Sequence, residues 1–317
     1  MICRIRHAFS LWSAGRLFIA SAATLVICAL AQSQAQPKSK VVTVRSPKVI
    51  NSRNQVDLTE AKAMLAAGLE AMTGKREAKD AWVALGLKPA DMVGIKINCN
   101  NWMITLSPPA ELLQALTDSL ALVVPANNII VYEASIADLE SSGFKRNSST
   151  AGVRFIGCNE GAGFDDEERL SRIATSTCTK LINFASLKCV EQGRGASLFF
   201  KNHIGSLVEK DMPKCHGNMD FLASTLAKPS LKNKTVLNIC NGLRGTYKQG
   251  VPWYWGGLIL GQDPVAAEFV AYQIINEKRE QEKVAALPLP EYLKIAESKY
   301  GLGTCTPGHV DWVKIER

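Results

Sequence analysis

Lysine and asparagine side chains occur together at two places where apolar runs of the sequence stop. Lys96 and Asn98 lie in "VGIKIN", and Lys201, Asn202 and His203 directly follow the aromatic run "SLFF". A lysine supplies a mobile positive charge and an asparagine supplies oriented donors, a combination suited to phosphate or carboxylate. Asparagines are also common turn residues, and a lysine on a strand often extends into water. These residue types therefore leave two possibilities open, the lip of a binding site or a strand that ends in solvent.

Carboxylate, thiol and imidazole groups occur in two later stretches. "PKCHGN" places Cys215 beside His216, a pair that could bind a soft metal or act as a nucleophile, although its spacing matches no recognised motif. In "GQDPVAAEF", Asp263 is followed by a proline, which is typical of a helix N-cap, and capping alone is worth roughly 1 kcal/mol. Glu268 lies about one helical turn further on. If a divalent metal is present, its candidate ligands are Asp263, Glu268 and His216, with a lysine to balance developing negative charge.

A glycine-rich stretch, "CNGLRGTYKQGVPWYWGG", lies between these two. Arg244 in this stretch could bind an anion through two parallel hydrogen bonds, and the aromatic side chains could stack on a ring. The stretch lacks the GK[ST] ending of a phosphate-binding loop, and aromatic residues beside a strand more often pack than bind. Arg244 is therefore a candidate ligand-binding residue outside any recognised motif.

Cysteine spacing argues against several cofactor classes. Nine cysteines occur, two of them in the first 35 residues, and none forms a CxxC pair. This argues against a structural zinc knuckle, a thioredoxin-like redox pair and a local iron–sulfur motif. In an oxidising compartment the odd number that remains leaves at least one cysteine unpaired in a monomer, and the pairing of the others is open.

The elements that must position these groups alternate between strands and helices. Ser107 is expected to cap the second helix, with Pro108 at its first position. A strand, helix, strand order favours parallel pairing, and ligands of open α/β sheets gather beyond the carboxyl ends of such strands. We therefore expect a single α/β domain over residues 36–317, with a mixed, mostly parallel sheet flanked by helices. The sequence predicts strands at 40–46, 91–100, 128–134, 153–157, 180–188, 235–240 and 257–261, and helices at 58–74, 107–123, 263–279 and 291–300, with a polar helix after a loop in 161–172.

The first 35 residues have the pattern of a signal peptide. Three arginines precede the apolar run 17–31, and Ser33 and Ala35 stand at the small-residue positions of a cleavage site. We expect cleavage near Ala35 and export to the periplasm or the exterior. The apolar run is shorter than the roughly 20 residues that span a bilayer, so no stable membrane insertion is expected after cleavage. An uncleaved membrane anchor is the alternative.

The charge of the chain indicates a class of ligand. Its net charge is +8, and because the leader holds three arginines and no acids, about +5 remains after cleavage. The basic residues are scattered rather than grouped with aromatic residues, which argues against nucleic acid as a partner. A mild basic excess is compatible with an anionic small molecule, while no feature identifies a partner protein.

The order of these motifs resembles the domain of unknown function 362 family, a group of uncharacterised α/β proteins. The similarity runs over roughly residues 85–280, through "VGIKIN", "LINFASLK", "FFKNHIG", His216, "NICNGLRGTYKQG" and "GLILGQDPVAAEF". Residue by residue, the resemblance implies site positions at Lys96, Asn98, Lys188, Lys201, Asn202, Gly205 and the run 263–266.

Two positions depart from the family pattern. Asn241 and Glu268 each stand where relatives often carry Asp. The change at Glu268 keeps a carboxylate, whereas the change at Asn241 removes one and weakens a metal or proton-transfer role there. Some relatives carry fused ferredoxin modules, but this chain has no such cysteine array, so a redox function is not carried over.

These observations lead to one main hypothesis for function. We expect an exported protein that binds an anionic or metal-chelated small ligand in a pocket of lysine, asparagine and carboxylate groups, and that acts as an enzyme of unknown reaction. The alternatives are a non-catalytic exported binding or scaffold module and a redox enzyme that uses a separate electron carrier. The candidate catalytic residues are Lys96, Lys201, His216 and Asp263, and the candidate ligand-binding residues are Asn98, Lys188, Asn202, His203 and Arg244.

Overall fold

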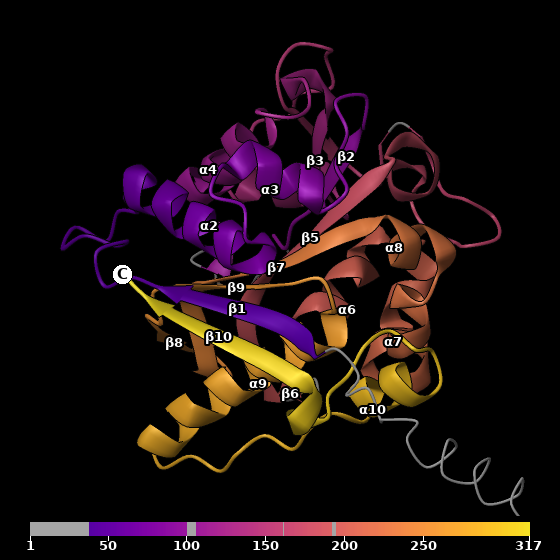
Figure 1. Ribbon diagram of the computed structural model, residues 1–317. Helices are drawn as coiled ribbons and strands as arrows, with labels where there is room; N and C mark the ends of the chain where they lie inside the picture. Colours follow the sequence, from indigo (N-terminus) through magenta and orange to yellow (C-terminus); the bar gives the residue numbers. More distant parts are fainter. Residues whose placement is uncertain (1–37, 100–105, 161, 192–194) are drawn as a thin grey trace, which may run out of the picture. The chain divides into compact units, whose positions relative to one another are not determined.

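The strands assemble into one ten-stranded sheet (Figure 1). Its main path runs in the order β10-β1-β9-β7-β5-β2-β3-β4, while β6 pairs with β5 and β8 pairs with β7. The five strands from β4 to β7 along this path are parallel, and β9 is antiparallel to both of its neighbours. The predicted α/β class with a mixed, mostly parallel sheet is confirmed. The strands are β1 (Ser39–Arg45), β2 (Val93–Lys96), β3 (Ile129–Glu133), β4 (Arg154–Gly157), β5 (Lys180–Val190), β6 (Gly195–Ala196), β7 (Thr235–Lys248), β8 (Val251–Trp253), β9 (Gly257–Gly261) and β10 (Val310–Glu316).

The computed structural model describes residues 38–317 except 100–105, 161 and 192–194. The predicted signal peptide at 1–35 lies outside the described residues. Residues Lys38–Arg317 group into one unit by their contacts. Within the described part of the chain, no helix is both long enough and apolar enough to cross a membrane.

The order of the parallel strands reverses direction beside β2. From β2 the chain passes through α4 (Ala110–Leu120) to β3 and then to β4, which lie on the same side of β2. It then returns across the sheet to β5, which lies on the other side of β2, and continues to β7. Such a reversal leaves a crevice at the carboxyl ends of the two central strands, because the segments that follow them diverge. The crevice is therefore expected between the ends of β2 and β5.

Helices cover both faces of the sheet (Figure 1). On one face, α2 (Leu58–Thr73), α3 (Ala78–Ala84) and α4 pack in one apolar cluster with the alternate residues Val93, Ile95 and Ile97. This alternation confirms the prediction for this strand and places Lys96 on the opposite face. The helices of that face are α6 (Phe199–Asn202), α7 (Met219–Leu226), α8 (Pro229–Lys234), α9 (Pro264–Gln281) and α10 (Glu291–Ser298).

Helix ends follow local capping chemistry, with one correction. Asp263 caps α9 as predicted, since its side chain accepts from the N–H groups of the next helical turn. The prediction for α4 was wrong, because this helix begins at Ala110 rather than at Pro108. A residue followed by proline disfavours the helical conformation, and Pro108 is followed by Pro109. Ser107 does not act as the cap, and its hydroxyl lies 3.0 Å from that of Ser142.

Two other segments differ from what the sequence suggested. Phe199–Asn202 forms the short helix α6, so of the two possibilities left open for this stretch, a strand that ends in solvent is wrong. The polar helix predicted within 161–172 does not form over the described residues before Arg172, where the chain has turns and isolated bridges; a short π-helical turn, Ile173–Thr177, follows instead. The Asp165 side chain accepts from the N–H groups of Glu167 and Glu168. Such local side-chain bonds offer the backbone an alternative to the helix, which explains the difference.

Candidate functional site

A cavity of about 480 Å³ opens at the carboxyl ends of β2, β3 and β5, where the strand order reverses. We call it the edge cavity. Its polar lining comes from the strand ends and from the segment that contains α6 and two 3₁₀ turns, His203–Ser206 and Glu209–His216. The residues that carry its polar chemistry are Asn98, Glu133, Lys188, Lys201, Asn202 and His216. Five of these six were predicted as site residues, and Glu133 was not.

Lys96 lies fully buried in the wall behind this cavity. Its Nζ donates to Oε1 of Glu133 at 2.8 Å and to the carbonyl oxygen of Ile97 at 2.7 Å. Burial raises the pKa of Glu133, and the adjacent Lys96 opposes that rise. A Cβ added at Gly205 would lie 3.1 Å from Lys96 Nζ, so glycine lets the backbone approach the ion pair closely. Removal of one partner from a buried ion pair leaves the other charge uncompensated, so we expect replacement of Lys96 to destabilise this wall.

A row of buried amides crosses the sheet beside this ion pair. Lys96, Asn183, Asn238 and Gly261 are in register on four adjacent strands. Asn202 donates to the carbonyl oxygen of Lys96 at 2.9 Å and to Oδ1 of Asn183 at 2.8 Å, and Asn183 donates to Oδ1 of Asn238 at 3.1 Å. Sequence reasoning missed Asn183 and Asn238. The signal was available, since each is a polar residue inside an apolar strand, a position that requires a hydrogen-bond partner.

Lys188 and Lys201 bring two amines to the edge cavity. Lys188 is 5% exposed, and its Nζ donates to Oδ1 of Asn98 at 3.3 Å, which joins the ends of β5 and β2. Burial lowers the pKa of Lys188 to about 8; the charge of Glu133 opposes this shift, and those of Lys201 and Lys96 reinforce it. Burial also lowers the pKa of Lys201. Both ammonium groups are thus less stable here than in water, and a bound anion would stabilise them.

Three consecutive side chains diverge in three directions from this segment. Lys201 lines the edge cavity, Asn202 bonds to the sheet, and His203 lines a second cavity. His203 is 1% exposed, and its Nδ1 lies 3.2 Å from Oγ of Ser206. Burial lowers the pKa of His203 to about 3, with Lys96 adding to the shift, so the imidazole is neutral near pH 7. From the sequence, all three residues were candidates for one binding pocket; Lys201 and Asn202 both line the edge cavity, whereas His203 does not.

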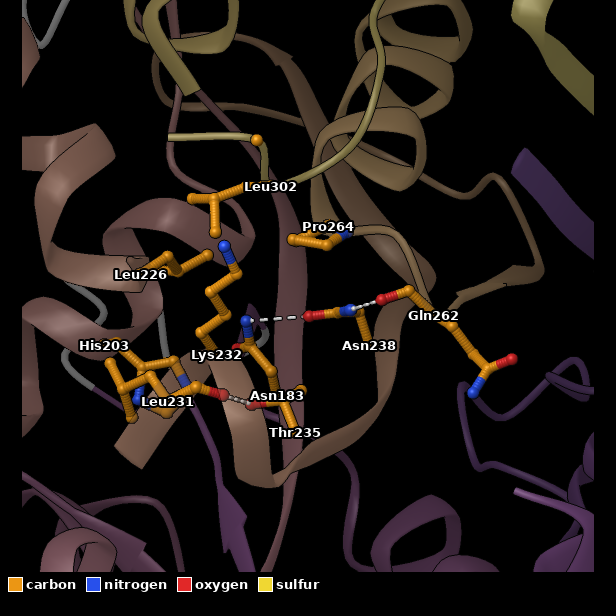
Figure 2. A pocket seen from close by; sticks show the side chains of 11 residues that line it. Asn183, His203, Leu226, Leu231, Lys232, Thr235, Asn238, Gln262, Pro264 and Leu302 are labelled. Carbon is orange, nitrogen blue, oxygen red and sulfur yellow. Dashed lines mark hydrogen bonds between the residues drawn. The ribbon is translucent and has the colours of Figure 1, made fainter. Parts of the chain in front are cut away.

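The second cavity has a volume of about 190 Å³ and lies over the amide row (Figure 2). We call it the amide cavity. Figure 2 shows Asn183 bonded to Asn238, and Asn238 bonded in turn to the backbone of Gln262. Apolar side chains of Leu226 and Leu231 complete much of the lining. Asn183 and Asn238 therefore satisfy one another and the backbone, and they leave little hydrogen-bonding capacity for a ligand.

The amino-acid sequence matches the model of a known protein family. The family model described as "Domain of unknown function (DUF362)" matches residues 93–273, more than half of the chain. The chain belongs to the DUF362 family. No match to a curated protein or to a solved structure was found. The matched region contains every residue named above as polar lining of the edge cavity, so the cavity is built within the DUF362 match.

The two carboxylates predicted near the start of α9 lie elsewhere in the DUF362 fold. Asp263 accepts four hydrogen bonds, two from the first turn of α9 and two from the side chain of Ser39 and the backbone of Thr304. Glu268 is fully buried and accepts from the N–H of Phe200 at 3.0 Å and from the hydroxyl of Tyr292. Burial raises the pKa of Glu268 to about 7. Neither carboxylate is among the residues that line the edge cavity.

The three candidate metal ligands therefore do not lie together in this DUF362 protein. His216 is exposed on the edge cavity, whereas Asp263 and Glu268 are engaged as described. Among the described residues, no group of three or more His, Cys, Asp or Glu side chains is arranged to hold a metal ion. A metal remains a prediction for which these residues supply no common site.

Two further candidates are placed as follows. Arg244 donates to the backbone oxygen and to Oδ1 of Asn54, at 2.6 and 2.9 Å, and is not among the residues that line the edge cavity. Cys215 lines the edge cavity beside His216, and burial raises the pKa of its thiol, which favours the unreactive protonated form. All seven cysteines of the described residues are buried and unpaired.

Proposed function

We propose that this protein binds an anionic small molecule in the edge cavity and acts on it as an enzyme. One observation carries the proposal: two lysine amines, each with a pKa lowered by burial, line the same cavity at the reversal of strand order. Open α/β sheets bind their ligands in this place. A site that holds two desolvated ammonium groups gains free energy when an anion restores the lost solvation.

The electrostatic balance of the lining supports an anion rather than a cation. Among the described residues that line the edge cavity, Glu133 is the carboxylate, and Lys96 neutralises it from inside the wall. Lys188 and Lys201 then leave a positive excess. Asn98 adds an amide group that can orient a bound carboxylate or phosphate, whereas Asn202 uses both of its N–H donors on Lys96 and Asn183.

Lys201→Ala provides the decisive test of binding. Calorimetric titration of the full chain with inorganic phosphate, citrate and oxalate identifies the anion that binds, and native mass spectrometry of protein purified without chelators reveals any ligand retained through purification. We expect Lys201→Ala to weaken the best anion at least about tenfold, as for a lost charge-assisted bond. Lys232→Ala is the matched control, because Lys232 lines the amide cavity instead.

The rival function is a non-catalytic binding or scaffold module. As a scaffold, it requires that Lys201→Ala and Lys232→Ala behave alike towards every anion, and equal affinities in the two variants would support it. A loss confined to Lys201→Ala, with an unchanged unfolding transition, would exclude the scaffold. Conversion of the bound anion to a product then distinguishes the enzyme from a binding module, which would return the anion unchanged.

We also propose that the protein is exported. The support is the sequence pattern of residues 1–35, with its basic start, apolar run and small residues before Gln36. Intact mass of the protein recovered from the exported fraction tests this directly. A chain that begins near Gln36 is expected, and a full-length chain held in the membrane fraction would favour the uncleaved anchor.

A further inference from the structure

Lys188 and Lys96 differ in the hydrogen bonds that hold their amines. Lys96 Nζ is ion paired with Glu133 inside the wall. Lys188 Nζ donates to the amide oxygen of Asn98, and its side chain lines the edge cavity. Lys96 is fully buried and is not among the residues that line the cavity. Of these two lysines, Lys188 is therefore the one that can meet an incoming molecule.

The surroundings of Lys188 favour the neutral amine. Burial is the main cause of its lowered pKa, and the two neighbouring lysines act in the same direction. A lysine desolvated in a pocket, or held near other cationic groups, is an activated nucleophile towards carbonyl carbon. The position is also accessible, because Lys188 lines a cavity of about 480 Å³ that exceeds the size of a small organic acid.

We infer that the Lys188 amine forms a covalent imine with an oxo acid, a compound that carries both a carbonyl group and a carboxylate. The inference rests on the proposed function, because the carboxylate is the anionic group that the edge cavity binds. Lys201, on α6, holds the carboxylate, while the carbonyl carbon meets Lys188. Asn98, bonded to Lys188 Nζ, orients the amine at the end of β2.

The imine step balances without an oxidant or a reductant. The neutral amine adds to the carbonyl carbon, so that a C–N bond forms and the carbonyl π bond breaks to give a carbinolamine. The hydroxyl group of the carbinolamine takes up a proton and leaves as water, and a protonated imine remains. From the ammonium form, one lysine ammonium and one carbonyl compound give one protonated imine and one water. Glu133, whose pKa burial raises, lines the same cavity and can carry the proton from the amine to the departing hydroxyl.

Reductive trapping tests the inference. The full chain is incubated with glyoxylate or pyruvate in the presence of sodium cyanoborohydride, which converts an imine into a stable secondary amine, and peptide mapping locates the adducts. We expect Lys188 to be labelled at least about tenfold faster than Lys232 near pH 7.5, because burial lowers the pKa of Lys188 to about 8 and so increases the neutral share of its amine. The labelling rate should rise through pH about 8, its lowered pKa, whereas exposed lysines rise at higher pH.

Two variants and one competitor separate the possible outcomes. Lys188→Arg keeps the positive charge but cannot form the imine, and it should lose the fast adduct, while Lys232→Arg should keep it. Lactate, an anion without the carbonyl group, should slow labelling of the wild type by competition. If lactate or phosphate binds but Lys188 is labelled no faster than exposed lysines, the imine is wrong and anion binding stands. If no anion binds and Lys188 shows no preference, the proposed function fails as well.

Discussion

The edge cavity and the amide cavity share one wall, the short segment 201–205, and both contain lysine, asparagine and histidine side chains. In the amide cavity, Asn183 donates to Oδ1 of Asn238 and both side chains donate to backbone carbonyl groups, while burial keeps His203 neutral. In the edge cavity, the side chains of Lys188 and Lys201 line the open space. The same residue types therefore stabilise the fold in one cavity and remain able to bind in the other.

The difference between the cavities follows from the strand ends. The amide row crosses four paired strands inside the protein, where a buried amide must find its partner within the protein. The edge cavity lies where β2 and β5 end and their following segments diverge, so its polar groups meet solvent or a ligand. Substitutions in the sheet should change the free energy of unfolding, and substitutions at the edge should change affinity.

Lys96→Met should have the largest effect on the fold. It leaves Glu133 buried without its cation, and we expect the free energy of unfolding to fall by about 3–5 kcal/mol at pH 7. The loss should shrink at lower pH, because Glu133 then takes up a proton. Urea denaturation at several pH values measures both effects. The double variant Lys96→Met/Glu133→Gln is the control and should recover part of the loss; a single-variant loss below about 1 kcal/mol would place Lys96 with the binding residues instead.

Glu268→Gln should remove a pH dependence from the segment that both cavities share. The carboxyl group of Glu268 accepts from Phe200 N at the start of α6, and burial raises its pKa from the ordinary 4.5 to about 7. The folded state therefore binds a proton more tightly than the unfolded state, so the wild type loses stability as pH rises between these two values. Relative to Glu268→Gln, that loss should be on the order of 3 kcal/mol. If the free energies of unfolding of the two proteins instead changed in parallel with pH, Glu268 would be ionised in the folded state over this pH range.

Asn238→Ala tests the amide cavity alone. It removes two donors to the carbonyl groups of Gly261 and Gln262 and the acceptor of Asn183. We expect a loss of about 1–3 kcal/mol in the free energy of unfolding, with anion affinity unchanged. Gln262→Ala, an exposed side chain on the same cavity, is the control and should change stability by less than about 0.5 kcal/mol. A weaker anion affinity in Asn238→Ala would show that the two cavities are coupled.

The sequence predicted the strands and the positions that the edge cavity uses more reliably than it predicted which residues share a site. The alternation in "VGIKIN" correctly placed Lys96 opposite its apolar neighbours, and the family pattern pointed to Lys188 and Lys201. Strand order is a long-range property, however, so no local pattern could place Glu133 on the same cavity as Lys188. Asp263 shows the converse, because the proline beside it indicated a cap, and a cap is one of the roles its carboxylate performs.

The three residues after "SLFF" show why neighbours in the sequence, all predicted for one binding site, can have different surroundings in the structure. A strand would have alternated Lys201 and His203 on one face and Asn202 on the other. A helical turn instead rotates successive side chains by about 100°, so the three project in different directions. The α-helical turn at Phe199–Asn202 is only four residues long, too short for a periodic pattern to reveal it.

Lys201→Ala should change the fold least and thereby mark the edge cavity as a binding region. Removal of the ammonium relieves a desolvation cost, while loss of the aliphatic chain removes packing, so we expect a net change within about 1 kcal/mol at pH 7. Because burial lowers the pKa of Lys201, the folded state binds this proton less tightly than the unfolded state, and the wild type should gain stability relative to the variant as pH rises from the lowered pKa towards 10.5. Urea denaturation at pH 7 and near pH 10 measures the difference. If the wild type lost stability relative to the variant on raising the pH, Lys201 would stabilise the fold through its charge. A loss of stability at pH 7 as large as that of Lys96→Met would likewise show that Lys201 is a structural residue.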